Sequence, residues 1–267
     1  GMETPIFGFA HDVATVAAIS QAGGYGVYGA TRRFPQEIRN ELAEIRSLVG
    51  DKPFGVDLVL PPGMPQHNSR EAIEAEIPQA HKDFVQSIID RFDVPAATKP
   101  GMRTRFIRSS EIEAEQIEAV LDSSVNMFAC GIGAPKPVVE AAKAKGQTTL
   151  ALIGSPHHVQ RSIDAGVEII VAQGYDAGAH TGTIGTFSLV PQIVEAAGDV
   201  PVLVAGGVAT GRHIAAALAM GAQGVWLGTA WLFSEEHQNH MHPVNTKKLI
   251  EAGSGDTVIT RSEPGKT

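Results

Sequence analysis

The 267-residue chain contains a single cysteine, Cys130, so it forms no internal disulfide. No apolar run approaches the ~18 residues that a membrane-spanning helix needs. No dense cluster of Lys and Arg offsets the formal net charge of −8. Nucleic acids and anionic membranes both recruit basic patches. We therefore expect a cytoplasmic protein with no nucleic-acid partner and no membrane partner.

Several catalytic signatures are also missing. The chain has no G-x-S-x-G sequence, no P-loop, and no dinucleotide-binding glycine pattern between a strand and a helix. Nothing near Cys130 in the sequence activates its thiol as a nucleophile. His237, His240 and His242 have near-helical spacing, but no acid or cysteine pattern accompanies them. We therefore predict no metal site.

What the chain does contain is a repeated unit. A helix-like stretch ends in a small residue and glycine, and a continuous apolar run follows. Glycine after a helix takes the left-handed conformation that ends it. A continuous apolar run is typical of a strand buried on both faces of a parallel sheet. The pattern predicts strands at 5–9, 25–30, 53–60, 124–131, 148–154, 168–174, 201–207 and 224–229.

Eight strands alternating with helices predict an α/β fold, a single (β/α)8 TIM barrel over 1–267. An open doubly wound sheet is the rival. The clearest helix is 35–50, with Ile38, Leu42, Ile45 and Leu48 predicted on its buried face. Residues 61–110 interrupt the rhythm and predict a helical insertion after strand 3, lying over the catalytic face or merely shielding a strand. The final stretch, 256–267, resembles the start of a further extended segment, and a longer natural chain is one interpretation of it.

Glycine-rich loops follow the last two predicted strands. They read VAGGVATGRH at 204–213 and LGTAWL at 227–232. Glycines at these positions let backbone N–H groups approach an anion, and TIM barrels often bind phosphate after strands 7 and 8. Turns from strand to helix also use glycine for purely structural reasons. Two such loops in succession favour a phosphate site.

A third loop, AQGYDAGAHTG at 172–182, follows predicted strand 6. Its glycines leave room for a ligand close to the backbone, and His180 is the side chain there that can move a proton near neutral pH. Asp176 either orients His180 or is solvated. His11, after strand 1, is expected on the same face of the barrel, and so is the glycine-rich loop at 128–135.

These segments, together with QAGGYGVYGA at 21–30, KPFGVDLVLP at 52–61, the run 201–232 and GDTVITR at 255–261, resemble the nitronate monooxygenase family. The resemblance implies a TIM barrel that carries FMN and oxidises alkyl nitronates with O2 to a carbonyl compound and nitrite. It implies His180 as the catalytic base. By the same resemblance, the FMN phosphate is held by Gly206, Gly207, Gly228 and Thr229, and the flavin is lined by Gln173 and Gly178.

The chain also departs from the family pattern. The loop after strand 1 reads GFAHD (8–12), and only position suggests that Phe9 and Ala10 line the flavin. Asp57 stands where the family often has Asn, and Ala179 where it usually has Gly. A carboxylate near the flavin's polar edge opposes negative charge on the ring unless it is protonated or turned away. The sequence therefore supports FMN binding more strongly than it supports a nitronate as the substrate.

Three alternatives remain open from the sequence. The first is an FMN- and NAD(P)H-dependent reductase of an enoyl thioester or related substrate, with Lys99, Arg103 and Arg105 of the insertion facing an acyl carrier or a CoA phosphate. The second is a non-redox phosphate-binding barrel, an isomerase or lyase. The third is an FMN-binding protein without turnover. Each enzymatic reading implies a small-molecule substrate, and the oligomeric state is left open, a homo-oligomer included.

Overall fold

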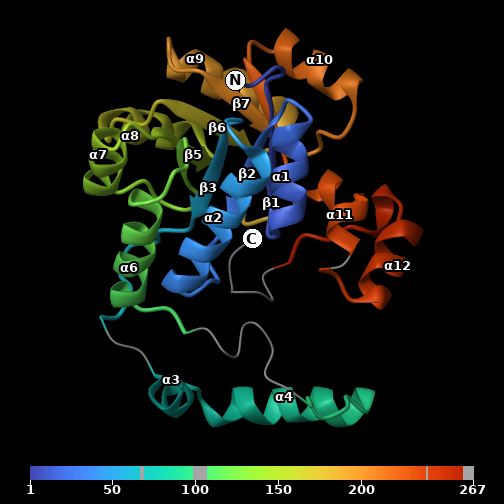
Figure 1. Cartoon of the computed structure of the whole chain (residues 1–267). Helices are drawn as coiled ribbons and strands as arrows, with labels where there is room; N and C mark the ends of the chain where they lie inside the picture. Colours follow the sequence, from blue (N-terminus) through green and yellow to red (C-terminus); the bar gives the residue numbers. More distant parts are fainter. Residues whose placement is uncertain (67–68, 99–106, 239, 261–267) are drawn as a thin grey trace.

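The computed structural model describes residues 1–66, 69–98, 107–238 and 240–260. Eight parallel strands close into a barrel in sequence order, with β8 paired to β1 (Figure 1). The eight predicted strands and the TIM barrel are confirmed. The strands are β1 Ile6–Ala10, β2 Tyr25–Gly29, β3 Phe54–Leu58, β4 Met127–Cys130, β5 Thr148–Ile153, β6 Ile169–Gln173, β7 Val202–Ala205 and β8 Gly224–Leu227.

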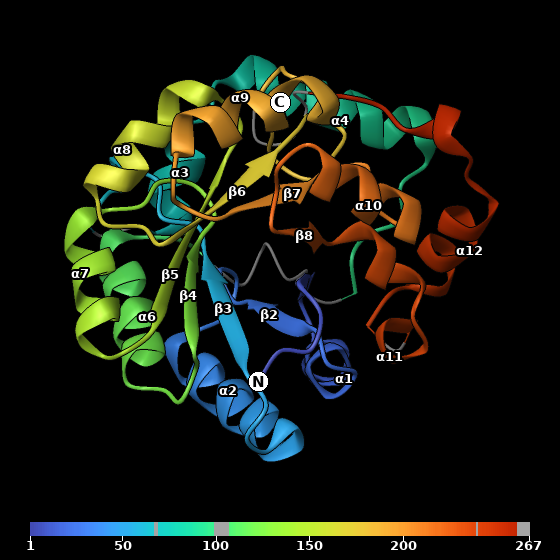
Figure 2. The same cartoon turned by 90° about the horizontal axis from the view of Figure 1, so that it is seen from above.

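Helices surround this barrel (Figure 2). Those that follow the strands in the barrel pattern are α1 Val13–Gln21, α2 Pro35–Val49, α6 Ser110–Leu121, α7 Lys136–Ala144, α8 Val159–Asp164, α9 Thr186–Ala197 and α10 Gly211–Ala219. The remaining described helices are α3 Arg70–Glu76, α4 Gln79–Phe92, α11 Glu235–Gln238 and α12 Pro243–Glu251, with short 3-10 turns η1 Pro156–His158, η2 Thr229–Phe233 and η3 Ser254–Asp256.

The repeated unit predicted from the sequence rests on glycines that follow helices. Gly23, Gly146, Gly166 and Gly221 come after α1, α7, α8 and α10, with φ values of 91°, 76°, 91° and 93°. An L side chain rarely adopts this conformation, so glycine both ends the helix and redirects the chain into the next strand. The local signal in the sequence and the observed turns therefore have the same cause.

Helix α2 shows how closely the pattern sets the buried face. Pro35 occupies its first turn, the Phe34 N–H donates to Glu37 Oε2 at 2.9 Å, and Gly50 follows its end with φ 60°. Ile38, Leu42 and Ile45 are buried as predicted. The prediction for Leu48 is wrong, because Leu48 is 47% exposed and Val49 takes the fourth buried position. Position 49 lies eleven residues, just over three full turns, after position 38, whereas position 48 lies about 80° off that face.

Two kinds of core fill the molecule. One cluster lies inside the barrel and includes Val27, Met127, Ala129 and Trp226. Two others lie between the strands and the helices, one over the first half of the chain and one over the second. Side chains alternate along a strand, so the inner faces of the strands supply one core and the outer faces supply the other.

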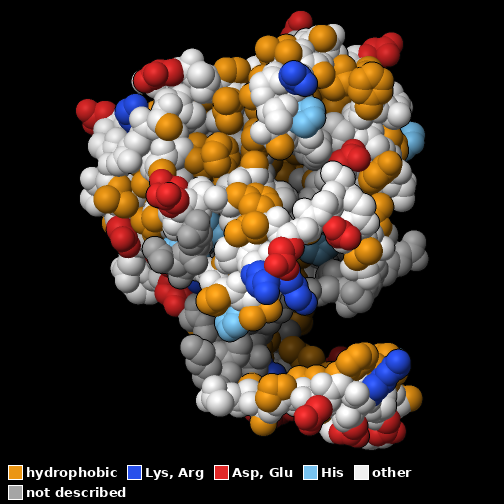
Figure 3. All heavy atoms as spheres, turned by 90° about the vertical axis from the view of Figure 1, so that its right-hand side faces the viewer, with side chains coloured by type: hydrophobic (Ala, Val, Ile, Leu, Met, Phe, Trp, Pro, Cys, Tyr) orange, Lys and Arg blue, Asp and Glu red, His pale blue; other side chains and the backbone are white. Residues whose placement is uncertain are grey.

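The insertion after β3 is helical, as predicted. Figure 1 shows α3 and α4 beyond the end of the barrel where the strands finish, and Figure 3 shows open space between this pair and the barrel. No residue of α3 or α4 is buried, and Phe84 and Phe92 of α4 are 65% and 63% exposed. A position over the catalytic face stays a prediction. Lys99, Arg103 and Arg105 lie outside the described residues.

Among the described residues, no helix combines the length and the apolar character needed to cross a bilayer.

Candidate active site at the carboxyl ends of the strands

The loop after β7 is built around two consecutive glycines. Gly206 and Gly207 have φ values of 98° and 70°. A Cβ on Gly206 would lie 2.8 Å from Thr186 Oγ1 and 3.0 Å from the Ala177 backbone nitrogen. Position 206 therefore excludes side chains both by conformation and by space. The backbone here is bare, which suits the close approach of an anion.

The helix that follows this loop already uses some of its N-terminal donors. His213 Nδ1 accepts from the backbone N–H groups of Ala209 and Thr210, at 3.1 and 3.3 Å. The N-terminus of α10 is thus partly capped by the protein itself. An anion bound by this loop has to rely more on the glycines and on the loop after β8.

The loop after β6 is closed by backbone contacts. The Tyr175 N–H donates to the Ile184 carbonyl at 3.0 Å, and Gln173 Nε2 donates to the His180 carbonyl at 2.7 Å. A Cβ on Gly182 would lie 2.3 Å from the Gly154 carbonyl oxygen, so the loop packs backbone to backbone on the end of β5. These contacts place the chain at His180 while leaving its side chain exposed. Within the described residues, the His180 ring makes no hydrogen bond.

Asp176 is exposed, which agrees with the solvated alternative, and its carboxyl also contacts the start of α9. Its Oδ2 accepts from the Thr186 N–H at 2.8 Å, at the start of α9. Partial burial opposes ionisation of Asp176, but the hydrogen bonds from Thr186 outweigh it, and the pKa of this carboxyl is lowered. Asp176 therefore joins the β6 loop to α9 and does not orient His180.

Several of the predicted site residues lie next to one another. A Cβ on Gly178 would be 2.9 Å from Thr229 Oγ1, and one on Gly228 would be 3.9 Å from Phe9 Cδ1. A Cβ on Gly207 would be 3.5 Å from Asp176 Cβ. The loops after β6, β7 and β8 thus meet each other and the end of β1. Ala10 differs, because its side chain packs in the core between strands and helices and leaves only its backbone for a ligand.

Aromatic rings surround the end of β1. The Phe9 ring lies edge-on to His11, 4.9 Å between centroids, and is stacked 5.9 Å from Trp226. His11 Nδ1 is 3.0 Å from the Gly29 carbonyl oxygen. A carbonyl only accepts, so Nδ1 carries the hydrogen and Nε2 is left as an acceptor. Desolvation chiefly lowers the pKa of His11, with repulsion from Arg32 and Arg33 adding to it.

Asp57, at the end of β3, is the most unusual group on this face. It is 6% exposed, and its Oδ1 has no hydrogen-bond partner among the described residues. Burial raises the pKa of this carboxyl to about 7, against a smaller opposing effect from the Gly131 N–H. The neighbouring Cys130 thiol lies in the outer core, and burial raises its pKa to about 12. An inactive Cys130 agrees with the sequence prediction.

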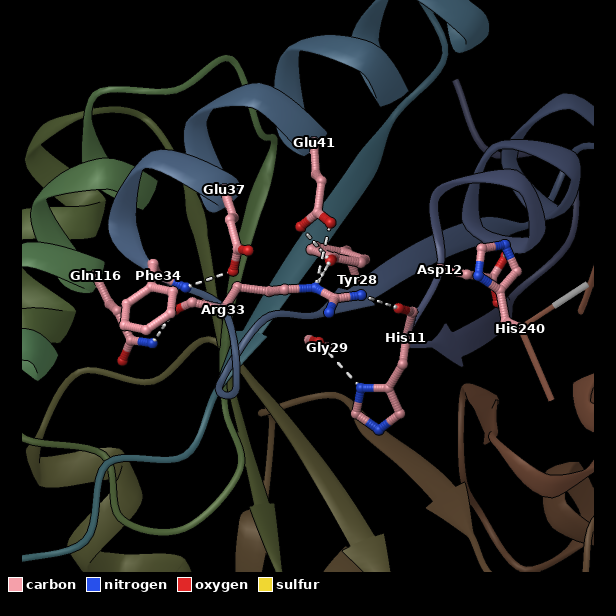
Figure 4. Close-up of polar contacts among 10 residues, drawn as sticks. All are labelled: His11, Asp12, Tyr28, Gly29, Arg33, Phe34, Glu37, Glu41, Gln116 and His240. Carbon is pink, nitrogen blue, oxygen red and sulfur yellow. Dashed lines mark hydrogen bonds and ion pairs between the residues drawn. The ribbon is translucent and has the colours of Figure 1, made fainter. Parts of the chain in front are cut away.

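A hydrogen-bond network around Arg33, which sequence reasoning missed, supports the end of β1 (Figure 4). Arg33 donates through Nη2 to the His11 carbonyl at 3.2 Å and through Nε to the Tyr28 hydroxyl at 2.8 Å. It also pairs with Glu41 at 3.2 Å, and Gln116 Nε2 donates to the Arg33 carbonyl at 2.7 Å. These partners are scattered in the sequence, so no local pattern signals them.

The histidines considered as metal ligands are used differently. His237 Nδ1 lies 2.7 Å from Asp12 Oδ2, and His240 Nε2 lies 3.8 Å from Asp12 Oδ1. Asp12 also accepts from the Thr15 N–H at 2.8 Å and so caps α1. A search of the described part of the chain finds no group of three or more side chains able to hold a metal ion.

The residues present fit a flavin mononucleotide. The bare backbone at Gly206 and Gly207 and the Thr229 hydroxyl are groups that hold a phosphate. Glycine at 178 and 228 keeps side chains out of the places where the β6 and β8 loops approach Thr229 and Phe9. The buried Oδ1 of Asp57, which has no hydrogen-bond partner among the described residues, is a polar group of the kind that a bound ligand satisfies.

Comparisons with known proteins agree with this geometry. The profile of the family described as Nitronate monooxygenase matches residues 3–267. The chain is 40% identical over 279 residues to Rv1533 of Mycobacterium tuberculosis, whose name describes a monooxygenase, covering 100% of this chain and 72% of that protein. FabK from Thermotoga maritima has a TM-score of 0.74 at 27% identity, covering 99% of this chain and 70% of FabK. Nitroalkane oxidase from Streptomyces ansochromogenes has a TM-score of 0.70 at 28% identity, covering 91% and 72%.

Proposed function

Because the chain belongs to the nitronate monooxygenase family, we propose that it is an FMN-dependent enzyme that oxidises alkyl nitronates with O2 to a carbonyl compound and nitrite. The single observation that carries the proposal is the meeting of the β6, β7 and β8 loops through glycines, with the His180 ring unengaged beside them. Family membership supports the redox chemistry, and the loop geometry supports the location of the site.

In this proposal the chain binds FMN through its phosphate and leaves the ring open to substrate. Gly206, Gly207, Gly228 and Thr229 hold the phosphate, and Gly178 and Phe9 border the ring. Bound FMN would accept electrons from the nitronate and pass them on to O2. Gln173 holds the His180 backbone in place through its 2.7 Å hydrogen bond.

His180 handles the proton. Its imidazole would take the α-proton from a neutral nitroalkane, or hold a nitronate that has already lost it. An exposed imidazole without protein partners suits a base whose partner is the substrate. The neutral His11 beside Phe9 is a second acceptor on the same face, through Nε2.

The test is a side-by-side anaerobic reduction. The purified protein is expected to be yellow, with the absorbance bands of a flavin. Mixing it with ethyl nitronate should bleach these bands within the mixing time, whereas NADH should bleach them slowly or not at all. The opposite pattern would favour the NAD(P)H-dependent reductase. A colourless protein that takes up no FMN would favour the non-redox barrel.

A further inference from the structure

Asp57 lies inside the barrel at its carboxyl end. Side chains alternate along β3, so Asp57 points to the same side as Gly55, whose register partners Val27 and Met127 line the interior. Its own partner on β4, Ala129, belongs to the same interior cluster. A buried polar group in such a place normally has a hydrogen-bond partner.

The residues around this carboxyl have small side chains or none. Its register partners are Gly29 on β2 and Ala129 on β4. Gly131, the first residue after β4, has no side chain, and a Cβ there would lie 3.0 Å from Asp57 Oδ1. The carboxyl therefore extends past the end of β4, toward the end of the barrel where the β6, β7 and β8 loops meet.

We propose that Asp57, in its protonated form, donates a hydrogen bond to a carbonyl oxygen of bound FMN, so that FMN binding above neutral pH is coupled to the uptake of one proton. The inference rests on the proposed function. The polar edge of a flavin ring carries two carbonyl oxygens and one N–H group. A neutral carboxyl offers the donor that a carbonyl needs, whereas a carboxylate offers only acceptors.

One of the groups near Asp57, the Gly131 N–H, favours its ionised form, but its effect is smaller than that of burial. On the β4 side the groups near Asp57 are the Gly131 N–H and the Cys130 thiol, and on the β2 side the His11 ring lies over Gly29. Neither ionisable group is charged near neutral pH, because the pKa of His11 is lowered and that of Cys130 is raised to about 12. With desolvation as the main influence, the pKa of Asp57 rises to about 7.

The experiment measures flavin affinity against pH. Flavin-free protein is titrated with FMN between pH 6 and 9, following the loss of flavin fluorescence. The apparent Kd should be level below about pH 7 and rise up to about tenfold per pH unit above it, because one proton must be taken up on binding. Riboflavin is titrated in parallel, since a phosphate monoester titrates near pH 6. It should show the same slope.

Asp57→Asn is the principal variant. An amide keeps the shape and a donor but cannot ionise, so the Kd of this variant should not change between pH 7 and 9. Asp176→Asn is the matched control, because Asp176 lies on the same face and its pKa is lowered. This control should retain the slope of the native protein.

A second measurement needs no variant. Calorimetric titration at pH 7.5 in two buffers with different ionisation enthalpies counts the protons taken up per FMN. With a ligand-free pKa of about 7, the proposal predicts the uptake of about three-quarters of a proton per FMN at this pH. No uptake, affinity that improves as pH rises, or an unchanged slope in Asp57→Asn would each overturn it. If the native protein binds no flavin even at pH 6, the proposed function fails together with this inference. If it binds flavin without the predicted pH dependence, only this inference fails.

Discussion

At the level of single residues, the protein treats the ionisable groups around the barrel mouth in opposite ways. Asp176 is held as a carboxylate by Thr186, whereas Asp57 is buried and its Oδ1 has no partner among the described residues. His11 is turned toward the Gly29 carbonyl, whereas the His180 ring stays exposed. Groups whose surroundings push their pKa values in different directions are typical of sites that move protons.

The role of His180 as a base predicts a split between two substrates. His180→Asn should lower kcat/KM for nitroethane by about a hundredfold or more, because general base catalysis typically contributes 10²–10⁴-fold. For ethyl nitronate, which is already deprotonated, the loss should stay within about tenfold. Steady-state oxygen consumption with each substrate checks this. Equal losses for both would instead mean that His180 positions the substrate and does not take the proton.

The raised pKa of Asp57 also predicts how stability depends on pH. Its folded-state pKa of about 7 lies above the ordinary value of 3.8, so its contribution to stability is fully present below 3.8 and is lost as pH rises to about 7. Asp57→Asn removes that loss. The free energy of unfolding of this variant minus that of the native flavin-free protein should increase steadily between pH 4 and 7. The increase should be about 4 kcal/mol at most over these three pH units.

Urea unfolding of both proteins without flavin, at pH 4.5 and pH 8, measures this difference. A gain of the same size at both pH values would assign the effect to packing and not to ionisation.

At the level of secondary-structure elements, the site depends on the turns that connect each strand to the helix after it. The turn after β7 needs Gly206 for its φ of 98° and for its contact with Thr186. The turn after β6 needs Gly182 and Gly154 because their backbones touch. Such turns lie at one end of the barrel, so the rigid strands beneath hold the loops in place.

Gly206→Ala should weaken FMN binding at least tenfold and destabilise the protein by about 1–3 kcal/mol, the usual range for a strained backbone position. Gly211→Ala is the matched control in the same loop-helix unit. Gly211 starts α10, and a Cβ there would meet no atom within 4 Å. It should leave FMN affinity unchanged. Thermal unfolding and FMN titration of both variants provide the comparison, and equal effects would refute the steric argument.

At the level of the whole molecule, one side chain links the first helix to the segment after the barrel. Asp12 caps α1 through Oδ1 and contacts His237 of α11 through Oδ2, 225 residues away. Arg33 similarly joins β2, α2 and the loop after β1. These contacts tie the end of β1, on which Phe9 and His11 are presented, to distant parts of the chain.

Two substitutions separate the roles of Asp12. Asp12→Ser keeps a side-chain acceptor for the cap but loses His237, whereas Asp12→Ala loses both. We expect Asp12→Ala to be the less stable of the two by about 1 kcal/mol, the usual value of an N-cap. Both should be less stable than the native protein in urea unfolding. Equal stability of the two variants would mean that the cap contributes nothing.

The sequence by itself determined the barrel. Its continuous apolar runs marked the eight strands, and the glycines after helices marked the turns, because both signals depend on residues adjacent in the chain. The glycine loops after β6, β7 and β8 could be assigned to one end of the barrel for the same reason, since parallel strands all finish there. The error at Leu48 arose where one position around a helix separates burial from exposure.

The tertiary structure alone decided the state of the ionisable groups. Asp176 accepts from Thr186, His213 accepts from two N–H groups just before α10, and His237 pairs with Asp12. Oδ1 of Asp57 has no hydrogen-bond partner among the described residues. A charge responds to every group within a few ångströms, whichever part of the chain supplies it. Sequence patterns report neighbours along the chain, so they could place Asp57 on its strand but could not show that the barrel would bury it unpaired.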